Sequence, residues 1–161
     1  MINKIVASVA DALADLKDGS IVMTGGFGGA GMPNELIDGL IERNAKDLVI
    51  VANNAGNGEA GLAALLKAGC VRKIICSFPR QTDSYVFDGL YRSGKLELEL
   101  VPQGNLAERI RAAGAGIGGF FTPTGYGTDL AAASPYANPV PIERAAIRRL
   151  LDNAFHGRKP E

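Results

Sequence analysis

The chain has 161 residues, of which 47% are hydrophobic and 21% charged, and its 17 basic and 17 acidic residues give a formal net charge of zero. This length and composition fit one globular domain with a sizeable core and exclude a disordered chain. The balanced charge gives no electrostatic reason to expect nucleic acid or an anionic membrane as a partner, and no apolar run approaches the ~18–20 residues that cross a bilayer.

The predicted elements begin with apolar residues at helical spacing from Ile5 to Leu16, followed by a buried strand at residues 21–24. A glycine-rich stretch comes next, and Pro33 marks the start of a second helix. The remaining elements are a strand at 48–52, a helix at 62–66, a strand at 73–77, a helix at 83–92, a strand at 96–100, a helix at 106–113 and a strand at 120–121. Alternating strands and helices with short connections predict an α/β fold with a mostly parallel sheet covered by helices.

The strict alternation of leucine and glutamate from Leu96 to Leu100 favours a strand at an edge of this sheet. The character of the sequence changes after Thr128. We therefore predict an α/β domain at residues 1–128, a linker at 129–141, and a terminal helix with a polar tail at 142–161.

Cys70 and Cys76 are the only cysteines, and their spacing and surroundings do not resemble a zinc site. We expect them to be reduced core residues of a cytoplasmic protein without a metal. The first helical stretch contains Asp11 and Asp15, so we do not expect a signal peptide.

The stretch from Gly26 to Gly31 fits the pattern G-x-G-x-x-G, but a dinucleotide site also needs an acidic residue about 20 residues later, at the end of the second strand. That strand ends in Ala52-Asn53-Asn54, which disfavours a nicotinamide cofactor. A phosphate loop of the Walker type is excluded because no Gly-Lys-Ser/Thr follows. Either the stretch is only a tight crossover, or its bare backbone and the following helix N-terminus favour anionic or carbonyl oxygens.

Several segments of residues 1–128 resemble the A (alpha) subunit of family I CoA-transferases. They are Gly25-Gly26-Phe27-Gly28, Gly31-Met32-Pro33, Asn53-Asn54-Ala55-Gly56, Val101-Pro102-Gln103-Gly104-Asn105-Leu106-Ala107-Glu108-Arg109 and Thr122-Pro123-Thr124-Gly125-Tyr126-Gly127-Thr128. Cys76-Ser77-Phe78-Pro79-Arg80-Gln81 is more similar to the 3-oxoadipate branch of the family than to the acetoacetate branch.

The resemblance implies a CoA-transferase-like fold of the NagB/RpiA type and transfer of CoA from succinyl-CoA to a 3-oxo acid, with a CoA thioester as substrate and no tightly bound cofactor. It also implies a heterodimer or A2B2 heterotetramer with a B subunit. In this family a glutamate of the B subunit forms a covalent thioester with CoA, so no catalytic nucleophile is expected on this chain. Because the resemblance ends near residue 128, we expect the C-terminal strands of the family to be missing and the chain alone to be inactive.

The same resemblance implies roles for particular residues. Gln103 matches a position that contacts the substrate carboxylate or thioester oxygen, although it could instead cap the following helix. Asn53 and Asn54 could line the same crevice or serve as turn residues. Arg80 could bind a distal carboxylate, although a surface ion pair is the simpler interpretation. The backbone assigned to CoA comprises Gly25, Gly26, Phe27, Gly28, Gly29, Ala30 and Gly31.

Two alternatives remain. The chain could be a non-catalytic module that binds an acyl-CoA or a protein, or it could belong to an acetoacetate CoA-transferase as its alpha chain.

Overall fold

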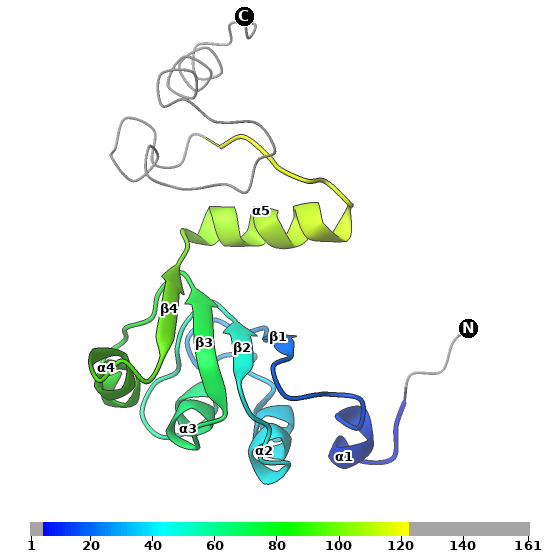
Figure 1. The fold of residues 1–161 in the computed structure, drawn as a ribbon, viewed down its shortest axis with the longest axis vertical. Helices are drawn as coiled ribbons and strands as arrows, with labels where there is room; N and C mark the ends of the chain where they lie inside the picture. Colours follow the sequence, from blue (N-terminus) through cyan, green and yellow to red (C-terminus); the bar gives the residue numbers. More distant parts are fainter. Residues whose placement is uncertain (1–4, 123–161) are drawn as a thin grey trace, which may run out of the picture. The chain divides into compact units, whose positions relative to one another are not determined.

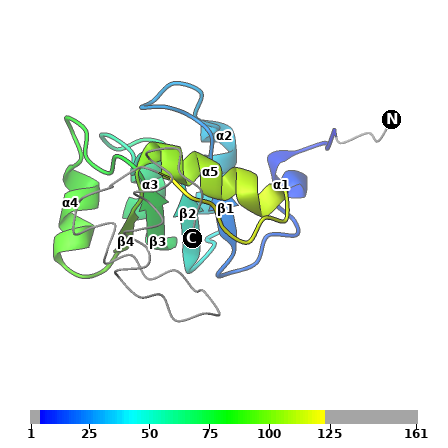
Figure 2. The same cartoon turned by 90° about the horizontal axis from the view of Figure 1, so that it is seen from above.

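The computed structural model describes residues 5–122 and contains one parallel sheet with the strand order β1-β2-β3-β4 (Figure 1). The strands are β1 (Ile21–Met23), β2 (Leu48–Val51), β3 (Val71–Cys76) and β4 (Glu97–Leu100). Seen from above, they follow one another across the sheet (Figure 2). The predicted parallel sheet is confirmed, and the alternating β4 is an edge strand, as expected.

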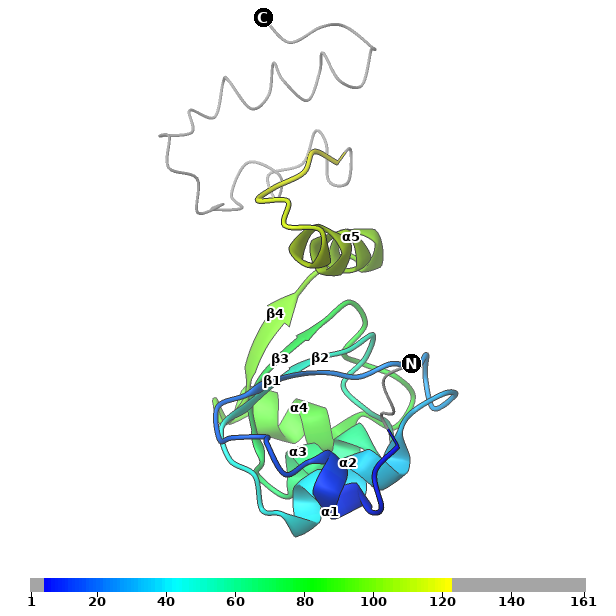
Figure 3. The same cartoon turned by 90° about the vertical axis from the view of Figure 1, so that its right-hand side faces the viewer.

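The helices are α1 (Val9–Ala12), α2 (Asn34–Glu42), α3 (Leu62–Lys67), α4 (Tyr85–Arg92) and α5 (Gln103–Gly114). Figure 3 shows α1 to α4 on one face of the sheet. Each strand pairs with the next one along the chain, so the right-handed crossovers all step in the same direction. Crossovers that step in one direction place their helices on the same face.

The core lies between this face of the sheet and the helices. All four residues of β2 are buried, with Leu48 and Ile50 fully so, and Ile74 of β3 lies beside Ile50. From the helices, Leu65 and Phe87 are buried in the same cluster. Burial of each such side chain stabilises the fold by about 1.5–3 kcal/mol. The packed strands therefore hold the loops that follow them in fixed positions.

Two expectations about secondary structure were wrong. The first helix begins only at Val9, because Ser8 is its N-cap and its hydroxyl accepts the N–H of Asp11 at 3.1 Å. Ile5 therefore precedes the helix and is 88% exposed. The strand predicted at residues 120–121 does not form; three glycines at 116, 118 and 119 precede it, and glycine disfavours extended pairing.

The chain divides into two compact units at Gln103/Gly104. The sheet, α1 to α4 and Gln103 belong to the first unit. The predicted linker at 129–141 and terminal helix at 142–161 lie outside the described residues.

Candidate functional site

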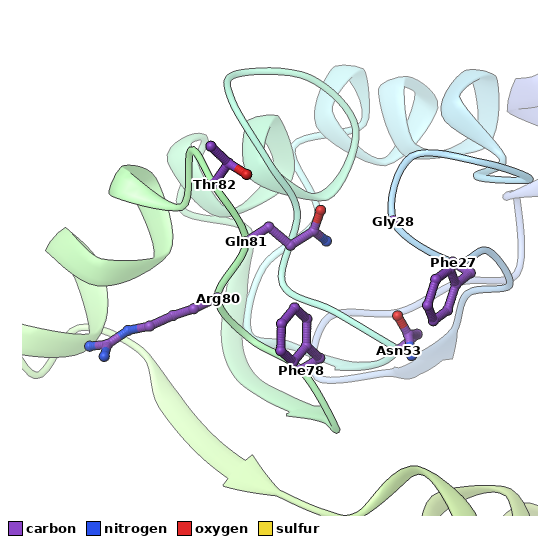
Figure 4. Close-up of a pocket in the computed structure, with 7 residues that line it drawn as sticks. All are labelled: Phe27, Gly28, Asn53, Phe78, Arg80, Gln81 and Thr82. Atoms are coloured by element: carbon purple, nitrogen blue, oxygen red, sulfur yellow. The ribbon is translucent and has the colours of Figure 1, made fainter.

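The loops that follow β1, β2 and β3 line a pocket of about 550 Å³. Parallel strands bring their carboxyl ends to one edge of a sheet, which is where open α/β sheets bind ligands. Figure 4 shows Asn53, from the loop after β2, between Phe27 of the first loop and Phe78 of the third. The lining residues are Phe27, Gly28, Asn53, Phe78, Arg80, Gln81 and Thr82.

The glycine-rich stretch forms a tight turn before α2 begins. The N–H of Phe27 donates to the carbonyl of Ala30 at 2.9 Å, and the N–H of Ala30 donates back at 3.1 Å. Phe27 and Ala30 thus close a two-residue hairpin turn whose central residues are Gly28 and Gly29. Gly28 has φ of +61°, and a hairpin turn of this kind requires a positive φ at its first central position. The helix α2 begins only at Asn34, so the N–H groups at the tip of the turn do not belong to the N-terminus of this helix.

The space beside Gly25 and Gly29 is not filled by other atoms of the described residues. A Cβ added to Gly25 or Gly29 would meet no atom within 4 Å, and neither residue has a positive φ. Among residues 5–122, the N–H groups of Gly28 and Gly29 have no hydrogen-bond partner. Neither backbone conformation nor packing within these residues therefore requires glycine at positions 25 and 29.

Asn54 is a fully buried side chain that connects two of the loops. Its Nδ2 donates to the carbonyl of Gly28 at 3.2 Å, and its Oδ1 accepts the N–H of Gly56 at 2.8 Å. It is not a lining residue of the pocket. The structure therefore gives Asn54 a supporting position beneath the glycine turn.

Asn53, Ser77 and Gln103 form a polar cluster beside the pocket, and the structure thus brings together two of the residues expected to bind substrate. The Nδ2 of Asn53 donates to Oε1 of Gln103 at 3.0 Å and to the Ser77 hydroxyl at 3.3 Å. The Ser77 hydroxyl lies 2.5 Å from the same Oε1. Gln103 is the first residue of α5, and the hydrogen bonds of its side chain connect it to Asn53 and Ser77.

Ser77 and Phe78 are residues at this site that were not predicted from the sequence. Ser77 directly follows β3, at the edge where Asn53 follows β2, and that shared position was the available signal. Phe78 is 60% exposed and Phe27 is 78% exposed, so both aromatic rings present apolar surface at the pocket. An apolar wall with a few polar groups is typical of small-molecule sites.

Arg80 lines the pocket with part of its side chain, but its guanidinium points away from it (Figure 4). Its Nε lies 2.6 Å from Oδ1 of Asp88 on α4. The structure thus contains the surface ion pair that was the simpler interpretation of Arg80.

Two other reactive side chains, Glu59 and Cys76, do not line the pocket. Glu59 forms an ion pair with Lys67 at 2.8 Å, and hydrogen bonding from Lys67 lowers the pKa of this carboxyl. Burial raises the pKa of the Cys76 thiol to about 11, so Cys76 is a protonated core residue near neutral pH.

Residues 5–122 contain no group of three or more His, Cys, Asp or Glu that could hold a metal ion. No helix among these residues is long and apolar enough to cross a membrane.

Comparison with known sequences gives a consistent set of relatives. The coenzyme A transferase family model matches residues 6–146. The chain is 72% identical over 131 residues to the A (alpha) subunit of 3-oxoadipate CoA-transferase from Pseudomonas putida, covering 81% of this chain and 57% of the relative. It is 64% identical over 138 residues to the corresponding protein from Acinetobacter baylyi, covering 86% and 60%.

A human mitochondrial succinyl-CoA:3-ketoacid coenzyme A transferase is 48% identical over 125 residues, covering 78% of this chain and 24% of the human protein. Among solved structures, a variant of the decarboxylase AibA/AibB matches with a TM-score of 0.66 at 22% identity. That match covers 83% of this chain and 53% of the other and supports the fold alone. The chain thus spans at most 60% of the length of these relatives.

Proposed function

The chain belongs to the coenzyme A transferase family, and from this premise we propose that it is the alpha subunit of a succinyl-CoA:3-oxoadipate CoA-transferase. In this proposal it binds the acyl-CoA and the 3-oxo acid, while a B subunit supplies the nucleophile. CoA passes from succinyl-CoA to 3-oxoadipate, which leaves succinate and 3-oxoadipyl-CoA. The CoA thioester is a substrate, and no tightly bound cofactor takes part.

The observation that carries the proposal is the meeting of Asn53 and Gln103, fifty positions apart in the sequence, beside the pocket that Gly28 lines. Attack on a thioester places negative charge on the carbonyl oxygen, and fixed N–H donors stabilise that charge. The N–H groups of Gly28 and Gly29 and the amide of Gln103 are neutral donors of this kind. Neutral donors can stabilise the charged transition state without adding a charge that over-stabilises the bound carboxylate.

The reacting carboxylate comes from outside this chain. None of the described residues that line the pocket is an acid. Glu59, the one acid within a glycine-rich turn, is held by Lys67, which lowers the carboxyl pKa and with it the basicity of the carboxylate. The partner carboxylate attacks the thioester carbonyl of succinyl-CoA and displaces CoA thiolate, which leaves a mixed anhydride between the enzyme carboxyl and succinate. The thiolate then attacks the enzyme carbonyl of this anhydride, so that succinate leaves and an enzyme CoA thioester forms. The carboxylate of the 3-oxo acid repeats the two steps in reverse, which gives its CoA thioester and frees the enzyme carboxylate.

The choice of 3-oxoadipate over acetoacetate rests on similarity to the alpha subunits of two 3-oxoadipate CoA-transferases. A second candidate function is a non-catalytic acyl-CoA-binding module. It is favoured by the lining of the pocket, in which none of the described residues is an acid.

The proposal is tested by mixing the purified chain with the B subunit of a 3-oxoadipate CoA-transferase and following thioester exchange from succinyl-CoA. We expect turnover with 3-oxoadipate, a lower rate with acetoacetate, and none with either polypeptide alone. Binding of succinyl-CoA without turnover in the mixture favours the binding module. Turnover by this chain alone contradicts the assignment of the nucleophile to a partner.

A further inference from the structure

A series of three side-chain amides connects the buried backbone beneath the pocket to Gln103. We propose that this series fixes which end of the Gln103 amide is offered to a ligand, and that Asn54, Asn53 and Ser77 are its positioning residues. The inference rests on the proposed function only where it names the ligand atom. It otherwise concerns the chain's own hydrogen bonds.

The series starts at two backbone groups whose polarity cannot change. The N–H of Gly56 can only donate and the carbonyl of Gly28 can only accept. Asn54 meets the first with Oδ1 at 2.8 Å and the second with Nδ2 at 3.2 Å. Turning the Asn54 amide over would set two acceptors against each other at one end and two donors at the other, so its orientation is fixed.

Asn53 takes its orientation from Asn54. The Nδ2 of Asn54 also lies 3.4 Å from Oδ1 of Asn53, which is a long but correctly polarised contact. With its oxygen on that side, Asn53 directs Nδ2 toward Gln103 and Ser77.

Gln103 is then held by two groups at the same atom. Its Oε1 accepts from Nδ2 of Asn53 at 3.0 Å and from the Ser77 hydroxyl at 2.5 Å. The Ser77 hydroxyl also lies 3.1 Å from the carbonyl of Asn53, and its single proton is assigned to the shorter contact with Gln103. Its Nε2 has no partner among residues 5–122. The side chain therefore offers two N–H donors beside the pocket, while its oxygen is occupied by Asn53 and Ser77.

A side chain that offers only N–H donors distinguishes ligand atoms by whether they accept or donate a hydrogen bond. Carboxylate and thioester carbonyl oxygens accept hydrogen bonds, whereas a ligand group that must donate finds no acceptor at Gln103. Under the proposed function this acceptor is the substrate carboxylate or the thioester oxygen, and the polarity of Gln103 originates at the carbonyl of Gly28 and the N–H of Gly56.

The substitution Asn53→Asp tests this inference because it keeps the shape and replaces the Nδ2 donor with an oxygen. The Gln103 amide should then turn so that Nε2 donates to the new carboxylate. Gln81 and Gln103 are the only glutamines in the chain, so their side-chain NH2 signals are assigned by comparison with Gln103→Ala. Proton exchange of each NH2 with water is measured by NMR on the labelled chain without ligand.

We expect the Gln103 NH2 to exchange as a solvent-exposed amide in the original chain and about tenfold more slowly in Asn53→Asp. Ser77→Ala removes one of the two groups that hold Oε1 and should let the amide reorient in part, while Ser77→Thr keeps the hydroxyl and should restore the original behaviour. A protected Gln103 NH2 in the original chain, or the same exchange in the original and Asn53→Asp proteins, overturns the inference. If Asn53→Asp does not fold, the original chain and the two Ser77 variants decide.

The new carboxylate also adds a charge, so function is measured as a double-mutant cycle with the B subunit present. We expect Asn53→Asp to raise the KM for the 3-oxo acid by about tenfold or more, and by less than about threefold when Gln103 is already alanine. Equal effects in both backgrounds contradict a role through Gln103. Absence of turnover in every mixture counts against the proposed function alone, because the NMR result still decides the orientation of Gln103.

Discussion

Gly56 lies so close to the first turn of α3 that a Cβ atom placed on it would be 2.3 Å from the amide nitrogen of Ala63. Its φ is +86°, a conformation that residues with a side chain rarely adopt. Its N–H is also the group that fixes Asn54. The loop after β2 can therefore pack this closely against α3 only because residue 56 has no side chain.

Gly56→Ala should destabilise the fold by about 2–5 kcal/mol, because it adds a steric overlap to the cost of a strained backbone. Gly58→Ala is the matched control, since Gly58 has φ of +62° in the same loop but no atom within 4 Å of an added Cβ. It should cost only the strain, about 1–2 kcal/mol. Urea unfolding measures both, and equal losses would refute the close contact at Gly56.

The clearance at the tip of the glycine turn gives a prediction about function. Gly29→Ala should leave stability within about 0.5 kcal/mol, because it meets no atom and needs no positive φ. In the mixture with a B subunit, however, the added methyl group should raise the KM for succinyl-CoA by about tenfold or more, because it would occupy space that we propose the thioester fills.

Gly89→Ala is the control for this experiment, because Gly89 on α4 is equally open and has no positive φ. It should leave the KM unchanged and stabilise the helix by about 0.5–1 kcal/mol. An unchanged KM in Gly29→Ala would mean that the thioester does not approach the turn.

The raised pKa of Cys76 gives a dependence of stability on pH. Burial raises this pKa from 9.0 to about 11, so between these values the unfolded thiol loses its proton while the folded thiol keeps it. The folded state then binds more protons, and the free energy of unfolding falls as pH rises through this window. Below about pH 9 the contribution is fully present.

Urea unfolding at a series of pH values, compared between the original chain and Cys76→Ala, isolates this contribution from other titrating groups. The slope above about pH 9 should be shallower in the variant. Identical slopes, together with rapid reaction of Cys76 with a thiol reagent in the folded chain, would show that the thiol is accessible.

Hydrophobic patterning predicted the order of the elements because each strand has a clear signature. Leu48–Val51 is a continuous apolar run and is buried throughout, and leucine alternates with glutamate in β4, which lies at an edge of the sheet. The pattern failed where local bonds decide the ends, as at Ser8, whose N-cap bond starts the first helix late. It also failed at residues 120–121, where two aromatic residues follow glycines and find no strand to pair with among the described residues.

The site was predictable to the extent that it follows from strand ends and from family resemblance. Asn53 and Gln103 were identified in this way, and the structure places them in contact. The division between Asn53 and Asn54 was not predictable, because neighbouring residues in extended backbone point to opposite sides and sequence does not say which side is the pocket. Ser77 was missed because the family resemblance implied no role for it, and only the neighbouring strand ends bring it to Asn53 and Gln103, 24 and 26 positions away.

The central claim is that this chain binds and orients substrate while a partner polypeptide reacts. Intact-protein mass spectrometry of the chain mixed with a B subunit and succinyl-CoA, without a 3-oxo acid, tests it most directly. The account predicts a CoA adduct on the B subunit and an unchanged mass for this chain. An adduct on this chain, on Glu59 or any other carboxylate, would contradict it.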